Sequence, residues 1–151
     1  MPVVRGWTSP DGWSIQRPVG WRGGKRQAYA QWTRPDRSAH VDVQSLYATD
    51  DVNQILDGSE LQLQESAQIR TLRKRAITHQ GGKGLDWEFT WTAGQGGERP
   101  WAAPGQRYHE VQRALVIGDR AFLLSWTTTE AQWQRNSRLM RQVIDSFTVG
   151  G

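Results

Sequence analysis

The sequence predicts an α+β fold in which an antiparallel sheet of about six to seven strands is flanked by helices. Three observations support this fold class. In residues 85–91 the leucine, tryptophan and phenylalanine side chains fall on one parity and the polar side chains on the other, as in a half-buried strand. Residues 107–117 and 121–127 are two further strand-like runs joined by a tight turn. After Thr129 the period changes to that of an amphipathic helix.

Three short strands precede the first predicted helix. Apolar residues alternate with polar ones in each strand, and turn residues separate them, including a proline at the second position of 34–37. The chain has 151 residues, which suits a single domain. We assign that domain to residues 11–149 and treat residues 1–10 as an N-terminal arm. The predicted strands are 13–17, 27–33 and 40–48.

The first helix is predicted to follow these strands. Asp50 or Asp51 is its expected N-cap, because an aspartate side chain can accept a hydrogen bond from the first helical turn. Apolar residues then recur at helical spacing in 52–56. We expect the glycine and serine at 58–59 to interrupt the helix and residues 60–69 to form a second helical piece.

The second half of the chain is predicted to hold the remaining strands and a final helix. Residues 81–84 form a hairpin connection, and residues 94–105 form a long loop. Thr129 and Gln132 have the spacing of a capping box at the start of the last helix. We expect this helix to cover the sheet, with residues 85–91 at the sheet's centre. The strands are 70–78, 85–91, 107–117 and 121–127, and the inward face of the helix is Asn136, Met140, Val143 or Ile144, and Phe147.

The chain contains nine tryptophans, whose positions suggest two different roles. Indole rings can stack on sugars or bases, but four of them share the parity of other apolar residues, which favours packing in the core. These four are Trp13, Trp87, Trp91 and Trp126. Trp7 and Trp101 instead lie beside glycine and proline in irregular chain. We therefore select Trp7 and Trp101, together with Tyr108, as candidate contacts for a ligand or partner.

Arg73 and Arg75 belong to the main basic cluster of the chain, at residues 70–75. On a strand their side chains share one face, where they would be solvated and discourage edge-to-edge pairing. Such a cluster can also bind phosphate groups, so both arginines are candidate contacts. A nucleic-acid binder is an alternative supported only by this cluster and the sequence pI of about 10.0. The carboxylates of Asp86 and Glu88 are expected to be solvated partners of such bases.

No arrangement typical of a catalytic or metal site is found in the sequence. His40, His79 and His109 are too far apart for a compact zinc motif, and no cysteine is present. The glycines at 81–84 lack the serine or threonine, and the following helix, of a phosphate loop. We therefore expect no enzyme activity, metal or cofactor. The lack of cysteine fits a reducing compartment, and equally an exported domain that needs no disulfides.

Three stretches of the sequence carry a resemblance to a known fold. They run from Asp11 to Trp21, from Asp86 to Trp91, and from Phe122 through Ser125-Trp126 to Phe147. With these residues the chain resembles the PsbP-like α/β/α sandwich, a fold that also includes a Ran-binding nuclear transport factor and mycobacterial lipoproteins. It is most similar to a domain that recurs at the extracytoplasmic C-termini of actinobacterial serine/threonine protein kinases.

The resemblance implies a non-catalytic binding or sensor module at the extracytoplasmic face of the cell membrane. The expected ligand is a protein or a component of the cell envelope, contacting residues 94–105 and the N-terminal arm. The resemblance implies no nucleic-acid partner, contact with the membrane only through a region outside this chain, and a monomer or weak dimer. A cytoplasmic location is expected if the domain is free-standing. The alternative function is an accessory subunit or scaffold of a larger protein assembly.

Overall fold

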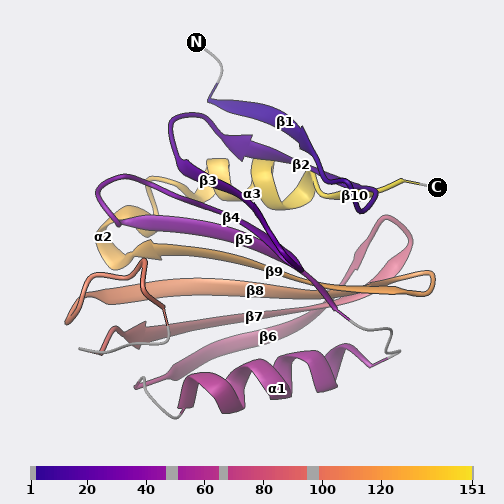
Figure 1. The fold of residues 1–151 in the computed structure, drawn as a ribbon. Helices are drawn as coiled ribbons and strands as arrows, with labels where there is room; N and C mark the ends of the chain where they lie inside the picture. The colour runs from indigo at the N-terminus through magenta and orange to yellow at the C-terminus, as the bar shows by residue number, and fades with distance from the viewer. Residues whose placement is uncertain (1–2, 47–50, 65–67, 95–98, 151) are drawn as a thin grey trace.

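Seven antiparallel strands form the main sheet, and a second sheet of three strands packs beside it (Figure 1). The computed structural model describes residues 3–46, 51–64, 68–94 and 99–150. In spatial order the main sheet comprises β3 (Arg22–Arg26), β4 (Tyr29–Thr33), β5 (Ala39–Leu46), β9 (Arg120–Thr129), β8 (Arg107–Ile117), β7 (Gly82–Thr92) and β6 (Arg70–His79). The smaller sheet comprises β1 (Val4–Thr8), β2 (Trp13–Pro18) and β10 (Thr148–Val149). The helices are α1 (Val52–Gln64), α2 (Glu130–Trp133) and α3 (Ser137–Asp145).

The predicted fold class is confirmed, and three strands that the sequence pattern did not reveal, β1, β3 and the short β10, complete the sheets. Residues 4–8 of the expected N-terminal arm form β1, which pairs along its whole length with β2. β3 has the sequence Arg-Gly-Gly-Lys-Arg and contains no apolar side chain to mark it as a strand. A β-carbon on Gly23 would lie 1.8 Å from the carbonyl oxygen of Gln31 on β4, so the close approach of these strands requires glycine.

Helix α1 is continuous, so the predicted interruption at residues 58–59 is wrong. The backbone N–H of Asn53 donates to Asp51 Oδ1 at 2.8 Å, which makes Asp51 the N-terminal cap, while Asp50 lies outside the described residues. The helix buries Leu56 and Leu63 against the sheet, and this burial offsets the low helix propensity of Gly58. Residues 60–64 therefore belong to the same helix rather than to a second piece.

The predicted final helix is divided into α2 and α3. Thr129 precedes α2 but makes no capping hydrogen bond through its side chain, so the capping box is absent. At the break the carbonyl of Gln132 accepts two hydrogen bonds from Asn136, one from its backbone N–H and one from its side-chain amide, both at 3.0 Å. Phe147 lies beyond the end of α3 but is fully buried, as its place on the predicted apolar face requires.

The hairpin connection before β7 is shorter than predicted. The two turn residues are Gln80 and Gly81, both with positive φ (51° and 74°), while His79 and Gly82 already pair as strand residues. Gly84 belongs to the strand, and a β-carbon there would lie 2.5 Å from Ile77 Cδ1. The predicted loop glycines are thus partly strand residues that let neighbouring side chains pack close to the backbone.

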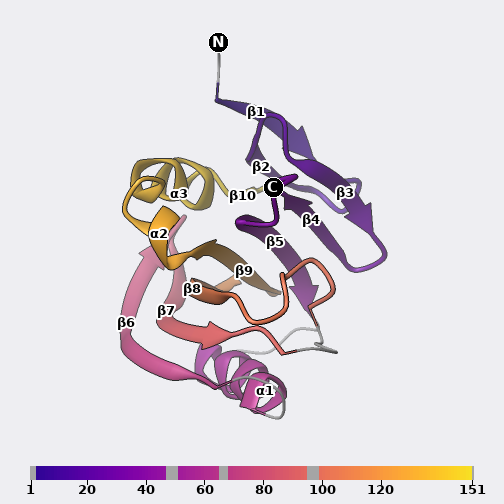
Figure 2. The same cartoon turned by 90° about the vertical axis from the view of Figure 1, so that its left-hand side faces the viewer.

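The two faces of the main sheet are covered by different layers (Figure 2). α3 and the three-stranded sheet cover one face, whose core includes Trp13, Trp32, Trp126 and Phe147. α1 packs on β7 and β8 on the other face, whose core includes Leu56, Leu63, Trp87, Phe89, Trp91 and Tyr108. The four tryptophans predicted to pack in the core are all buried. However, residues 85–91 present their aromatic side chains to α1, and the C-terminal helix lies on the opposite face.

The polar side chains of β7 are not solvated as predicted, because they face α2 and α3. Arg113 donates from Nε and Nη2 to the two carboxylate oxygens of Asp86 at 2.8 and 2.9 Å. Burial alone would lower the pKa of Arg113, but its carboxylate partners hold that pKa above the ordinary value. Glu88 Oε2 lies 2.7 Å from His109 Nε2, and Glu130 of α2 lies 2.9 Å from the other ring nitrogen. These carboxylates are therefore structural partners of buried bases.

Substitution of Trp87 by alanine tests the assignment of this residue to the core beneath α1. Trp87 is fully buried and stacks on Phe89 with ring centroids 3.9 Å apart. We expect Trp87→Ala to lower the free energy of unfolding by about 3–5 kcal/mol, measured by urea denaturation. Leu61→Ala on the outer face of α1, where the side chain is 65% exposed, should change it by less than about 0.5 kcal/mol. Similar effects of both substitutions would contradict the assignment.

Candidate functional site

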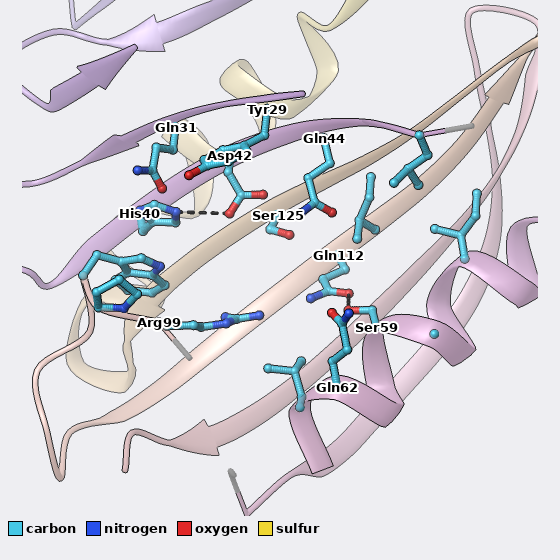
Figure 3. A pocket seen from close by; sticks show the side chains of 17 residues that line it. Tyr29, Gln31, His40, Asp42, Gln44, Ser59, Gln62, Arg99, Gln112 and Ser125 are labelled. Atoms are coloured by element: carbon cyan, nitrogen blue, oxygen red, sulfur yellow. Dashed lines mark hydrogen bonds and ion pairs between the residues drawn. The ribbon is translucent and has the colours of Figure 1, made fainter. Parts of the chain in front are cut away.

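An open cleft of about 910 Å³ lies on the α1 face of the main sheet (Figure 3). Its floor is formed by β4, β5, β9 and β8, one wall by α1, and the other by residues 99–101. Its volume lies in the range of about 300–1,000 Å³ that is typical of small-molecule sites. The lining residues are Tyr29, Gln31, His40, Asp42, Gln44, Leu46, Ile55, Gly58, Ser59, Gln62, Leu63, Arg99, Pro100, Trp101, Gln112, Leu123 and Ser125.

The floor of the cleft consists of polar side chains in register across four strands. Gln31 of β4 pairs with Asp42 of β5, Asp42 with Ser125 of β9, and Ser125 with Gln112 of β8. Because neighbouring strands are about 4.8 Å apart, this row presents a hydrogen-bonding group at each such interval. A second row, parallel to the first, contains Tyr29, Gln44 and Leu123. The cleft therefore offers an ordered array of side-chain donors and acceptors.

His40 and Asp42 form a hydrogen-bonded pair at the edge of this floor. His40 Nε2 lies 3.1 Å from Asp42 Oδ2, and His40 Nδ1 lies 2.7 Å from Thr33 Oγ1. The imidazole stacks on the indole of Trp101, with centroids 4.1 Å apart and planes inclined by 5°. His40 is thus fixed on both ring nitrogens and on one face, and its partner Asp42 remains 24% exposed.

Glu110 is a fully buried carboxylate beneath the wall of the cleft. It accepts hydrogen bonds from Trp91 Nε1 at 2.9 Å and from Gln112 Nε2 at 2.8 Å, and it forms an ion pair with the Arg99 guanidinium. A buried carboxylate requires such compensation, because loss of water otherwise disfavours its charge. The positive charge of Arg99 is therefore matched by a carboxylate of the protein itself.

Arg37 holds the wall formed by residues 99–102 in place. It stands at a turn with φ of 64°, and its guanidinium donates to the carbonyls of Pro100, Trp101 and Ala102. The Tyr108 hydroxyl donates to the carbonyl of Arg37 at 2.9 Å and accepts from the N–H of Ala103 at 2.9 Å. Burial raises the pKa of Tyr108 above its ordinary value. These bonds connect the wall to β8 and to the turn before β5.

The structure brings only part of the predicted contact set to the cleft. Trp101 lines it, while Tyr108 is fully buried beneath the wall and supports it. Trp7 packs on Trp13 and Trp32 on the opposite face of the sheet. The two arginines, Arg73 and Arg75, are exposed on the edge strand β6, where the Nε of Arg73 donates to Glu88 at 2.9 Å. The set does not form one site, and its role in binding stays a prediction.

The residues that build the floor were not selected from the sequence. In the sequence, Gln31, Asp42 and Gln44 were only the polar residues at alternate positions of two predicted strands. The one indication in the sequence was a run of amide and carboxylate side chains at alternate positions of these strands. This run becomes a site only because β9 and β8 add Ser125 and Gln112 in register. Of the histidines, His40 alone lines the cleft, and the described residues contain no group of three potential ligands placed to hold a metal ion.

Comparisons with known proteins place the chain in a family and a fold. The family model for the serine/threonine kinase C-terminal domain matches residues 7–149. A search of curated proteins finds no match. Cyanobacterial PsbP (CyanoP) from Synechocystis sp. PCC 6803 is similar in structure, with a TM-score of 0.70, 15% identity, and coverage of 99% of this chain and 94% of that protein.

Two further solved structures share the fold at low sequence identity. LpqN of Mycobacterium tuberculosis, described as involved in cell envelope biogenesis, has a TM-score of 0.64 and 12% identity, over 99% of this chain and 93% of its own. The Ran-binding protein Mog1p of Saccharomyces cerevisiae has a TM-score of 0.63 and 12% identity, over 97% and 95% of the two chains. The expected PsbP-like fold is thereby confirmed.

Substitution of Arg37 by alanine tests how the wall of the cleft is held. We expect faster amide hydrogen exchange at Ala102, Gly105 and Gln106, because three carbonyls lose a charged donor. The global free energy of unfolding should fall by less than about 1 kcal/mol, since water can replace an exposed donor. Arg37→Lys should behave like Arg37→Ala, because one ammonium cannot match the guanidinium fork. Arg34→Ala is the control. Unchanged amide exchange at Ala102, Gly105 and Gln106 in Arg37→Ala would show that Arg37 does not hold the wall.

Proposed function

Because the chain belongs to the family of serine/threonine kinase C-terminal domains, as the match over residues 7–149 shows, we propose that it is a non-catalytic ligand-binding domain. The ligand occupies the cleft on the α1 face of the sheet. The observation that carries this proposal is the row of Gln31, Asp42, Ser125 and Gln112, which lies on the floor of an open cleft. Polar groups that converge in a well-formed pocket are a usual mark of a binding site.

The bonding of His40 and Glu110, two of the titratable groups at the cleft, supports a role in binding rather than in catalysis. A general base needs a free atom that can take a proton from the substrate. Both ring nitrogens of His40 are already bonded, and Glu110 is buried under Arg99, Trp91 and Gln112. Asp42 is the carboxylate with access to the cleft, and it is bonded to His40 through one oxygen.

We further propose that this domain works at the extracytoplasmic side of an actinobacterial membrane-linked kinase and takes a ligand of the cell envelope. The family supports the link to a kinase, and the structural likeness to LpqN, a protein involved in cell envelope biogenesis, supports the choice of ligand. The described residues include no helix with the length and hydropathy of a membrane span. The reading frame upstream of residue 1 tests the proposed setting, since a membrane helix and a kinase domain are expected there.

Blocking the cleft with a bulky side chain tests the proposed function. Gln44 is exposed on β5 inside the cleft, so Gln44→Trp should fill the space without disturbing the core. We expect isothermal titration with soluble envelope fractions to show binding to the wild type and a loss of at least about tenfold in affinity in Gln44→Trp. Gln142→Trp, at an exposed position of α3 on the opposite face, should bind like the wild type. Equal binding by all three proteins would exclude the cleft as the site.

A further inference from the structure

We infer that the ligand of the cleft is a saccharide without negative charge, either neutral or carrying an amino group. This inference rests on the proposed function, because it names the class of ligand for the same site. Three properties of the described residues lead to it: unpaired amide and hydroxyl groups, the distribution of charge, and the position of the cleft on a sheet face.

Several polar side chains in the cleft have no hydrogen-bond partner among the described residues. Figure 3 shows them extending from the strands and from α1 into the open space. Each side-chain amide carries a donor and an acceptor on one planar group, and a hydroxyl carries both on one atom. A sugar hydroxyl is likewise both donor and acceptor, so a ring with several hydroxyls can pair with such an array. The side chains concerned are Tyr29, Gln31, Gln44, Gln62 and Ser125.

The charges around the cleft disfavour an anionic ligand. Asp42 keeps one carboxylate oxygen without a partner among the described residues, and its side chain is 24% exposed. An anion placed near this oxygen would be repelled, whereas a hydroxyl or an ammonium group could donate to it. Arg99, the cation of the wall, is already paired with Glu110. Among the described residues that line the cleft, Asp42 therefore offers a free acceptor oxygen and the one cation, Arg99, is compensated by Glu110.

The position of the cleft disfavours an extended peptide as its ligand. Peptides that bind to sheets usually add a strand at an edge, where backbone groups are free. The floor here is the face of strands β4, β5, β9 and β8, whose backbones are paired with one another. At this floor a ligand must therefore be recognised by side chains. Leu123 at the floor, together with Leu63 and Ile55 on α1, adds an apolar area on which the C–H groups of a sugar ring can pack.

Titration calorimetry with a panel of small saccharides tests this inference. The panel contains maltose, a mannose disaccharide, the N-acetylglucosamine dimer, the glucosamine dimer and the galacturonate dimer. We expect binding of at least one of the first four and no detectable binding of galacturonate. Asp42→Asn keeps an acceptor for His40 but removes the charge, so it should weaken glucosamine binding roughly tenfold or more and reduce the discrimination against galacturonate. Gln142→Ala on α3 is the matched control.

The possible outcomes separate the class of ligand from the existence of the site. If none of the neutral or amino saccharides binds, while an envelope fraction still binds the wild type and fails to bind Gln44→Trp, the inference is wrong and the proposed function stands. Preferred binding of galacturonate would also overturn the inference. If the envelope fraction binds the wild type and Gln44→Trp equally, the proposed function fails first. Binding of a panel saccharide that Asp42→Asn weakens and Gln142→Ala leaves unchanged supports both.

Discussion

Strand β9 buries eight of its ten residues and β8 six of its eleven, on both faces of the sheet, and this is possible only because a separate layer covers each face. α3 and the three-stranded sheet together cover one face. α1 lies on the other, and a helix is about 10–12 Å wide, whereas seven strands span about 30 Å. One helix therefore covers only part of that face. It packs on β7 and β8, where Trp87 and Phe89 supply the apolar surface.

The uncovered part of the same face becomes the cleft. α1 packs mainly on β7 and β8, so the cleft-facing side chains of β4 and β5 include the polar residues Gln31, Asp42 and Gln44. Residues 99–102 provide a second wall, which Arg37 and Tyr108 hold against the sheet. The polar side chains of β7 point to the other face of the sheet, where helices cover them. Asp86 and Glu88 lie under α2 and α3 and need buried bases as partners.

The sequence predicts a strand well where the strand's own alternation of apolar and polar residues marks it. It fails where an element depends on contacts with segments far away in the sequence. The alternation in residues 85–91 and the turn between β8 and β9 are local, so β7, β8 and β9 were all predicted. β3 has no apolar side chain to reveal it, and nothing in the apolar pattern after Thr129 marks the break between α2 and α3. Parity shows which residues share a face, but it does not show which layer covers that face. For this reason the aromatic residues of β7 were assigned to the wrong helix.

The candidate site was harder to predict than the fold, because it exists only in the register of four strands. Trp101 was selected for its irregular surroundings, and it does line the cleft, whereas Trp7 belongs to an aromatic cluster on the other face. Nothing in the sequence places Ser125 between Asp42 and Gln112, since these residues are far apart along the chain and meet through strand pairing. The only indication of the cleft floor in the sequence was an excess of amide side chains at alternate positions of the predicted strands.

Chemical-shift mapping of the ¹⁵N-labelled protein by NMR, during titration with a soluble envelope fraction, would locate the bound ligand on the structure. We expect the shifted amides to cluster on β4, β5 and β9, around Gln31, Asp42 and Ser125, and on the facing side of α1. Shifts confined to the edge strand β6, or to α2 and α3 on the opposite face, would contradict this expectation.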